Sequence, residues 1–189
     1  LMKLNGEGAV ELYYDGSKKF NTTNDGGTLT GNLFVSEALQ LNDSKKIELG
    51  NSGAFQIFHD SNDAFIRNTT GNLIFEAKSG EKAILALPDS GVQLFCDDEL
   101  KLQTIENGII VYGPEGGDGV IHLRADEGDD TGDKWRFNAL AAGGFTVENR
   151  ADNSWETNIK CVGAGQTELY YDDSKKFETN SAGVEVTGI

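Results

Sequence analysis

The sequence predicts an all-β protein in which short antiparallel strands form hairpins that repeat along the chain. The first observation is the decapeptide ELYYDGSKKF at Glu11–Phe20, which returns as ELYYDDSKKF at Glu168–Phe177. The second is the abundance of turn-forming residues, including 24 glycines, between short apolar stretches. Internal repeats indicate that equivalent supersecondary units are stacked, so an elongated structural protein is expected before an enzyme.

The repeat extends on both sides of the decapeptide. About half of the residues in 2–32 recur at the aligned positions of 159–189. Glycine adopts positive φ without a steric penalty, so retained glycines indicate the same turns in both copies. The retained glycines are Gly6, Gly8, Gly26 and Gly31 in the first copy and Gly163, Gly165, Gly183 and Gly188 in the second.

Two weaker copies are predicted between these. Phe55–Asp60 and Val92–Asp97 share the order apolar, polar, apolar, aromatic, any residue, Asp. Any strand that ends in an Asp turn would give this order, but a glycine also keeps its place downstream, at Gly71 and Gly108. The retained glycine favours degenerate copies, so the hairpin is expected four times.

The first copy shows how the strands are assigned. Ala9–Tyr14 and Lys18–Thr23 are expected strands around the turn that begins at Asp15, and Thr28–Thr30 follows a second turn. The Asp25-Gly26 pair in that second turn predicts a hairpin, because a type I′ turn needs positive φ at both central residues. Further strands are expected at Lys46–Leu49, Ala54–His59, Ala64–Asn68, Leu73–Ala77, Ala83–Leu87, Val92–Phe95, Leu100–Thr104, Ile109–Tyr112, Val120–Ala125, Lys134–Ala139, Phe145–Asn149, Trp155–Val162, Thr167–Tyr171, Lys175–Glu178 and Val184–Thr187.

Two segments interrupt the strands. Leu33–Leu41 has a loosely helical spacing of apolar residues, but it is short and lies between strands, so a helix is not favoured. Gly113–Gly119 is rich in glycine without the lysine of a phosphate-binding loop, and it is interpreted as a linker or turn. The chain therefore divides into a hairpin repeat at 1–33, degenerate hairpin repeats at 34–113, a β-meander at 114–164 and a hairpin repeat at 165–189. It is expected to be a segment of a longer protein.

Both faces of the repeated hairpin are partly apolar. Strand alternation places Val10, Leu12 and Tyr14 on one face and Tyr13 with Glu11 on the other. The strands are also too short to suggest a simple sandwich. Since both faces need cover, which sister chains or the next repeat would supply, we expect an elongated, intertwined homotrimer with β-prism or β-helix-like segments.

The charge argues against several partners. The formal net charge is −15, so nucleic acid is not expected, because phosphate binding needs a concentrated basic surface. The pairs Lys18-Lys19, Lys45-Lys46 and Lys175-Lys176 stand isolated among acidic residues and are interpreted as solvated. No apolar run approaches the roughly 20 residues that span a bilayer, so membrane insertion is not expected either.

Several stretches resemble the repeats in tail fibres and related structural proteins of marine bacteriophages, notably cyanophages. They are GAVELYYDGSKKFNTT (8–23), GQTELYYDDSKKFETNSAGVEVTG (165–188), residues 47–77, 121–137 and 145–160, and the segments 30–33 and 187–189. The resemblance implies a trimeric, β-rich component of the virion that serves host attachment. Its implied partners are identical chains, other tail proteins and a host surface glycan or protein contacted by regions outside this chain. A polysaccharide-degrading tailspike segment and a capsid-surface decoration or fibre module are the alternatives.

The acidic run Asp126–Asp133 is the strongest candidate for a cation site, since Ca²⁺ prefers carboxylate oxygens. Its spacing differs from that of a calcium-binding EF-hand, because Gly128 stands at a ligand position and the closing Glu is missing. A polar turn between two strands is favoured. His59 and His122 lie on expected strands without a second histidine at metal-ligand spacing. No metal ligand is therefore assigned.

No catalytic or cofactor-binding residue is assigned, because no nucleophile elbow, phosphate-binding loop, dinucleotide fingerprint or zinc signature is present. A glycan-cleaving pair of carboxylates stays open as an alternative. The aromatic residues Trp135, Trp155, Tyr13, Tyr14, Tyr112, Tyr170 and Tyr171 could stack on sugars, but core or inter-chain packing is favoured. Cys96 and Cys161 replace apolar strand residues and are expected to be small buried side chains rather than a disulfide.

Overall fold

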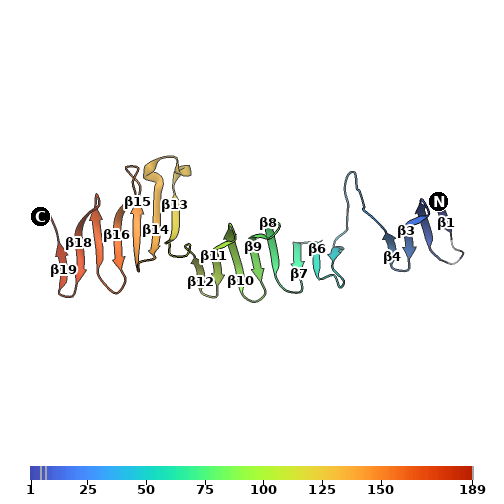
Figure 1. Ribbon diagram of the computed structural model, residues 1–189, viewed down its shortest axis with the longest axis horizontal. Helices are drawn as coiled ribbons and strands as arrows, with labels where there is room; N and C mark the ends of the chain where they lie inside the picture. The colour runs from blue at the N-terminus through green and yellow to red at the C-terminus, as the bar shows by residue number, and fades with distance from the viewer. Residues whose placement is uncertain (5, 7, 189) are drawn as a thin grey trace. The chain divides into compact units, whose positions relative to one another are not determined.

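The protein is all-β in the computed structural model, which describes residues 1–4, 6 and 8–188. Its strands form four antiparallel sheets of consecutive strands, none of which closes on itself (Figure 1). The chain divides into two compact units, Leu1–Ile47 with Ile57–Phe65, and Glu48–Gln56 with Ile66–Ile189. The expected fold class of short antiparallel strands is confirmed.

The first sheet has the order β1-β2-β3-β4 and the second the order β5-β6-β7. Their strands are β1 (Met2–Leu4), β2 (Val10–Tyr14), β3 (Ser17–Thr23), β4 (Gly26–Leu29), β5 (Lys46–Leu49), β6 (Phe55–His59) and β7 (Ala64–Asn68). The sequence predicts all of these except β1.

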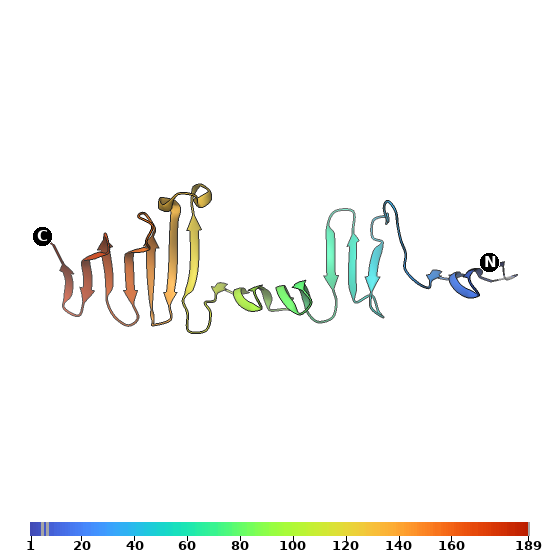
Figure 2. The ribbon, with the colours of Figure 1, turned by 45° about the horizontal axis from the view of Figure 1, so that its top comes forward.

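The third sheet has five strands and the fourth has seven, again in chain order. The five are β8 (Leu73–Lys78), β9 (Glu81–Leu87), β10 (Gly91–Cys96), β11 (Glu99–Ile105) and β12 (Gly108–Val111). The seven are β13 (Gly119–Arg124), β14 (Lys134–Leu140), β15 (Gly144–Asn149), β16 (Glu156–Val162), β17 (Thr167–Tyr171), β18 (Ser174–Asn180) and β19 (Gly183–Val186). Figure 2 shows the seven strands side by side, with the short helices η1 (Asp126–Gly128) and η2 (Thr131–Asp133) between β13 and β14.

A meander of four strands occurs three times with one register, as β1–β4, β9–β12 and β16–β19. In the first copy Leu12 pairs with Met2 and with Phe20, and Phe20 pairs with Leu29. The aligned residues pair in the same way in the other two copies. These rows are Ile84, Leu94, Leu102 and Val111, and Ile159, Leu169, Phe177 and Val186. The repeat is therefore a four-stranded unit, longer than the expected hairpin.

The central hairpin of each copy turns through two residues at positive φ. These are Asp15 and Gly16, with φ of 48° and 70°, Asp97 and Asp98, with 55° and 58°, and Asp172 and Asp173, with 52° and 49°. Two central residues at positive φ define a type I′ turn, and Asp tolerates this region better than most residues. A register shift follows the leucine of every copy, between Leu12 and Tyr13 and at the aligned positions. The prediction that Asp15 and Asp172 form turns is confirmed.

The turn between β3 and β4 differs from the expected one. Thr23 pairs with Gly26, so Asn24 and Asp25 are the central residues, and positive φ falls on Gly26 at 142°. The other copies turn in the same way, because Ile105 pairs with Gly108 and Asn180 with Gly183, at φ of 156° and 139°. In all three copies the positive φ falls on the glycine after the central pair. The hairpin is confirmed, but the type I′ turn at Asp25-Gly26 is wrong.

The weak copy at Phe55–Asp60 forms a hairpin with a different turn. The Asp60 amide donates to the Asp63 carbonyl over 3.1 Å, so Ser61 and Asn62 are central and only Ser61, at φ 85°, has positive φ. Oδ1 of Asp60 accepts the amides of Asn62 and Asp63, at 3.1 and 2.9 Å. These backbone hydrogen bonds, that of Asp63 above all, lower the pKa of Asp60. This copy has three strands, β5 to β7, and lacks a counterpart of β4 in its sheet.

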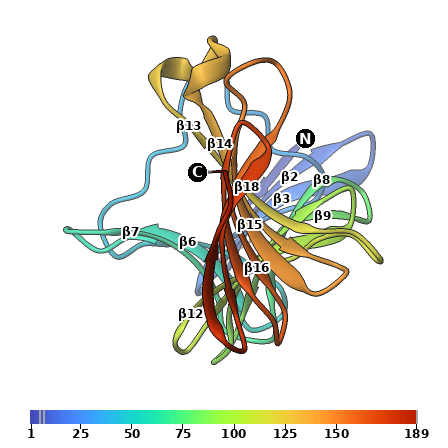
Figure 3. The same ribbon diagram turned by 90° about the vertical axis from the view of Figure 1, so that its left-hand side faces the viewer.

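Leu33–Leu41 is irregular and exposed, and Gly113 to Asp118 form a loop, as the sequence predicts. The sheets are single layers (Figures 1 and 3), so they bury few apolar side chains. Within the described part of the chain, Leu85 is the one buried hydrophobic residue, and it is still 8% exposed. A folded monomer of 20.4 kDa exposes about 8,800 Å², whereas this chain exposes 13,974 Å².

Candidate functional site

The acidic run Asp126–Asp133 forms the turn between β13 and β14, as predicted. One carboxylate oxygen from each of Asp129, Asp130 and Asp133 lies within 4.8 Å of the others. Hydrogen bonds within the turn occupy two of these carboxylates, because the Asp130 amide donates to Asp129 at 3.1 Å and to Asp133 at 3.3 Å. The cluster thus caps its own turn, and nothing beyond the acidic residues points to a cation.

A charged cluster lies on one face of β17 and β18. Glu168, which is 4% exposed, accepts hydrogen bonds from the Tyr170 hydroxyl at 2.6 Å, Gln166 at 3.1 Å and Lys175 at 3.3 Å. Lys175 also binds Glu178. The hydrogen bond to Glu168 raises the pKa of Tyr170 to about 12. The same bond, with those from Gln166 and Lys175, lowers the pKa of Glu168.

The first copy carries the same cluster in more exposed form. The Tyr13 hydroxyl and the Lys18 ammonium reach Glu11 at 2.9 and 3.1 Å. The Lys18 pair is exposed, as predicted, and Lys175 is half-buried. Both lysines nevertheless form ion pairs, because the register shift after the leucine brings tyrosine and lysine opposite each other. The recurrence of Glu, Tyr and Lys at equal spacing in both copies was the available sequence signal.

A second charged cluster surrounds Trp155. The guanidinium of Arg136 lies 4.3 Å from the indole centroid, the ring of His122 5.6 Å and the guanidinium of Arg124 5.9 Å. Arg136 also donates from Nε to Glu148 at 2.5 Å. Burial, together with Arg124 and Arg136, lowers the pKa of His122. Trp155 thus packs within the chain, against cations rather than an apolar core.

Two neighbouring carboxyl groups in the described part of the chain, those of Asp152 and Glu156, have pKa values shifted in opposite directions. Burial and a hydrogen bond to Asp152 raise the pKa of Glu156, while hydrogen bonds from Ser154 lower that of Asp152. A retaining or inverting enzyme holds its two carboxyls about 5 to 9.5 Å apart around the glycosidic bond. The direct hydrogen bond between Asp152 and Glu156 leaves no room for that bond.

The remaining candidates are scattered. Tyr14 and Tyr171, next to the hairpin turns, are 76% and 74% exposed, so their packing against a sister chain stays a prediction. Tyr112 donates its hydroxyl to Gln103, and His59 contacts Asp43 at 3.2 Å. Both cysteines are free thiols, and Cys161 is half-buried. The prediction that Cys96 is buried is wrong, because it lies at the exposed strand end beside Asp97.

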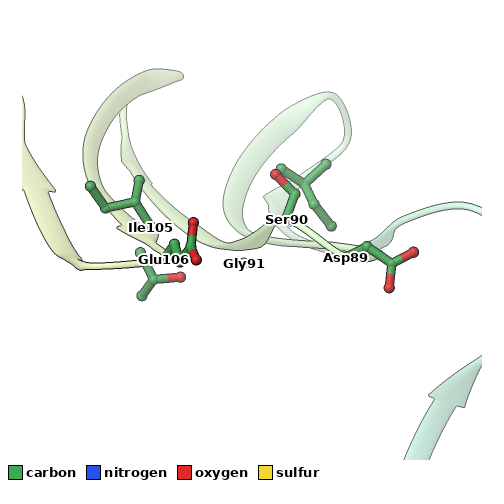
Figure 4. Close-up of a pocket in the computed structure, with 7 residues that line it drawn as sticks. Asp89, Ser90, Gly91, Ile105 and Glu106 are labelled. Atoms are coloured by element: carbon green, nitrogen blue, oxygen red, sulfur yellow. The ribbon is translucent and has the colours of Figure 1, made fainter.

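An open hollow recurs at one position of the three meanders. In β9–β12 it measures about 580 Å³ and lies where Gly91 begins one strand and Ile105 ends the next (Figure 4). The aligned hollows measure about 340 and 470 Å³. In each copy a backbone amide near the start of the second strand donates to a threonine hydroxyl of the third strand, at 2.9 to 3.0 Å. The accepting residues are Thr22, Thr104 and Thr179. The hollow is thus a consequence of the repeated turn geometry.

Comparison with protein-family models, curated proteins and solved structures finds no match to this chain. Among the described residues, no helix is long and apolar enough to cross a membrane. Of the predicted candidates, the structure brings together the three aspartates of the acidic turn and places His122 beside Trp155. The Glu168 cluster is the best-formed arrangement, and its hydrogen bonds and ion pairs join β17 to β18.

Proposed function

We propose that this chain is a structural segment of a phage appendage, such as a tail-fibre shaft or adaptor, and works as an assembly of identical copies. The assembly is an elongated, intertwined homotrimer with β-prism or β-helix-like segments, located on the virion. The resemblance of the repeats to tail-fibre proteins supports the role. The observation that carries the proposal is that a four-stranded unit recurs three times with its sheets left uncovered.

The exposed area makes a stable lone chain physically unfavourable. The surplus over a folded monomer of this mass is about 5,000 Å², while a specific interface covers about 800 Å² on each partner. Identical chains are the simplest partners to cover this exposed surface, because each presents the same sheets. A repeated unit also suits a shaft, since adding units adds length without new chemistry.

The best-formed polar cluster also fits a structural role. Glu168 has a lowered pKa and is held by three donors, so it is charged at neutral pH and already occupied. A general acid needs a raised pKa and access to substrate. Host recognition in this proposal belongs to regions outside this chain, in contact with a host glycan or protein.

Two measurements test the proposal. Sedimentation equilibrium of the 189-residue chain is expected to give three times the chain mass of 20.4 kDa, and a monomer at all concentrations would contradict it. Antibody labelling of virions is expected to decorate the tail. Labelling of the head would favour a decoration module, and release of reducing ends from host polysaccharide would favour a tailspike.

A further inference from the structure

The seven-stranded sheet carries an apolar row that crosses all of its strands. Alternation places every second side chain of a strand on one face, and the register aligns one apolar residue from each strand. Each residue of this apolar row pairs with its neighbours in the row. The apolar row consists of Ile121, Phe137, Val147, Ile159, Leu169, Phe177 and Val186.

A second line of side chains on the same face extends the apolar surface. Phe145, Cys161 and Val184 stand two residues from members of the apolar row, in strands β15, β16 and β19. The rings of Phe137 and Phe145 stack with centroids 6.1 Å apart. The face defined by these residues and the apolar row, called the apolar face below, contains no charged side chain among them.

The opposite face is largely polar and carries charges of both signs. Its aligned row is Val120, Asn138, Thr146, Lys160, Glu168, Glu178 and Glu185. Glu168 on this face is 4% exposed, because its own hydrogen-bond partners cover it. Leu169 and Val186 on the apolar face are 42% and 58% exposed. On the opposite face, charged side chains such as Glu168 are therefore paired within the sheet, whereas the apolar face is left exposed to solvent.

The other meanders present equivalent rows. The five-stranded sheet aligns Phe75, Ile84, Leu94, Leu102 and Val111. The first sheet aligns Met2, Leu12, Phe20 and Leu29. Exposed apolar rows of this length mark an interaction surface, because burial of apolar area is the main source of association free energy. A partner for three equivalent rows must itself repeat with the same strand spacing.

We propose that the apolar face is the surface through which copies of this chain pack on one another, with the apolar face of a sister chain as its occupant. A sister chain has the same rows at the same spacing. The net charge of −15 makes copies repel through their charged surfaces, so the apolar faces are the favourable contact. This inference rests on the self-association proposed above and adds which face is buried.

Cys161 provides a native reporter, because it lies on the apolar face, where it pairs with Phe145. Cys96 stands two residues from Leu94 and thus lies on the equivalent face of the five-stranded sheet, so the reference is Cys161 itself in chain diluted until it dissociates. With a small thiol-alkylating reagent, Cys161 of the assembled chain is expected to react at least about tenfold more slowly than in the dissociated chain, as protection by a buried interface requires. Mass spectrometry of the Cys161-containing peptide measures both rates.

A matched pair of substitutions on β19 tests the face directly. Val186→Lys adds a charge to the apolar face, whereas Glu185→Lys makes the neighbouring change on the opposite face. Val186 is 58% exposed and Glu185 is exposed too, so neither lysine disrupts a single chain, and circular dichroism of each variant checks this. V186K is expected to weaken association at least about tenfold, the effect of a buried unpaired charge. E185K is expected to leave association unchanged or to strengthen it.

The outcomes separate the inference from the proposed function. An assembly in which Cys161 reacts as fast as in the dissociated chain, or in which V186K associates like the unsubstituted chain, would overturn the apolar face as the interface and leave self-association standing. A chain that is monomeric at every concentration would overturn both. Protection of Cys161 together with selective weakening by V186K would support both.

Discussion

Replacing Tyr170 with phenylalanine removes one hydroxyl and keeps the ring, so it isolates the hydrogen bond to Glu168. That bond is 2.6 Å long, and its acceptor is 4% exposed. A hydrogen bond to a charged group contributes about 1.5 to 3 kcal/mol. Gln166 and Lys175 remain on Glu168, so we expect the lower end, about 1.5 kcal/mol. For a protein of this length that corresponds to a fall of roughly 3 to 6 °C in the melting temperature.

Thermal unfolding followed by circular dichroism, at one fixed protein concentration, measures the loss. Hydrogen exchange of the β17 and β18 amides shows whether it is local. Tyr13→Phe is the matched control, because its hydroxyl makes the equivalent bond at 2.9 Å to the more exposed Glu11. Tyr13→Phe should lower the melting temperature by less than Tyr170→Phe does. Equal effects of the two substitutions, or none from Tyr170→Phe, would refute the burial argument.

Three further outcomes follow from the same geometry. The pKa of Glu168 in the folded state is lowered, so its contribution to stability is complete above the unfolded-state pKa and is lost as pH falls through the folded-state pKa. In melts at several pH values, the difference in melting temperature between Y170F and the unsubstituted chain should therefore shrink on acidification and persist at neutral pH. Asp172→Ala should destabilise by about 1 kcal/mol because φ is 52°, and Asp172→Gly by less, in urea titrations; equal losses would point away from backbone strain. Chelator should leave the melting temperature unchanged, and a sharp drop would show that the Asp129, Asp130 and Asp133 cluster holds a structural cation.

Much of the strand order could be predicted because two well-preserved copies of the repeat show the same alternating pattern. A slip of one residue would move Leu12 and Phe20 to the other face, so the apolar pattern specifies the register. Asp15 and Asp172 could be assigned to turns for the same reason, since each follows an alternating stretch. The turn at Asn24 was missed because the positive φ falls on the glycine after the central pair, Gly26, Gly108 or Gly183, and not on the pair itself.

The polar clusters could not be predicted from spacing alone. Tyr170 and Lys175 face each other only because a register shift follows Leu169, and no pattern in the sequence marks that shift. Trp155 precedes β16 yet contacts Arg136 on β14, two strands away in the sheet. Such contacts depend on the long reach of a side chain over its neighbours, which strand periodicity does not encode.

The three meanders act as a natural substitution experiment on one scaffold. In the middle copy Gln93, Phe95 and Leu100 replace the glutamate, tyrosine and lysine of the polar cluster. The strand pairing, the register shift and the type I′ turn nevertheless stay the same. The polar cluster therefore stabilises the hairpin without specifying it.

What all three copies keep is the aspartate that opens the turn, the threonine that accepts the second-strand amide and the apolar row. The turn and the threonine explain the hairpin geometry within one chain. The apolar row and its equivalents in the other two copies are left exposed by their own single-layer sheets. They are nevertheless retained in the middle copy, where the residues on the opposite face change from charged to neutral. A face that stays apolar while its reverse varies is what contact with an invariant partner requires, and an identical chain is such a partner.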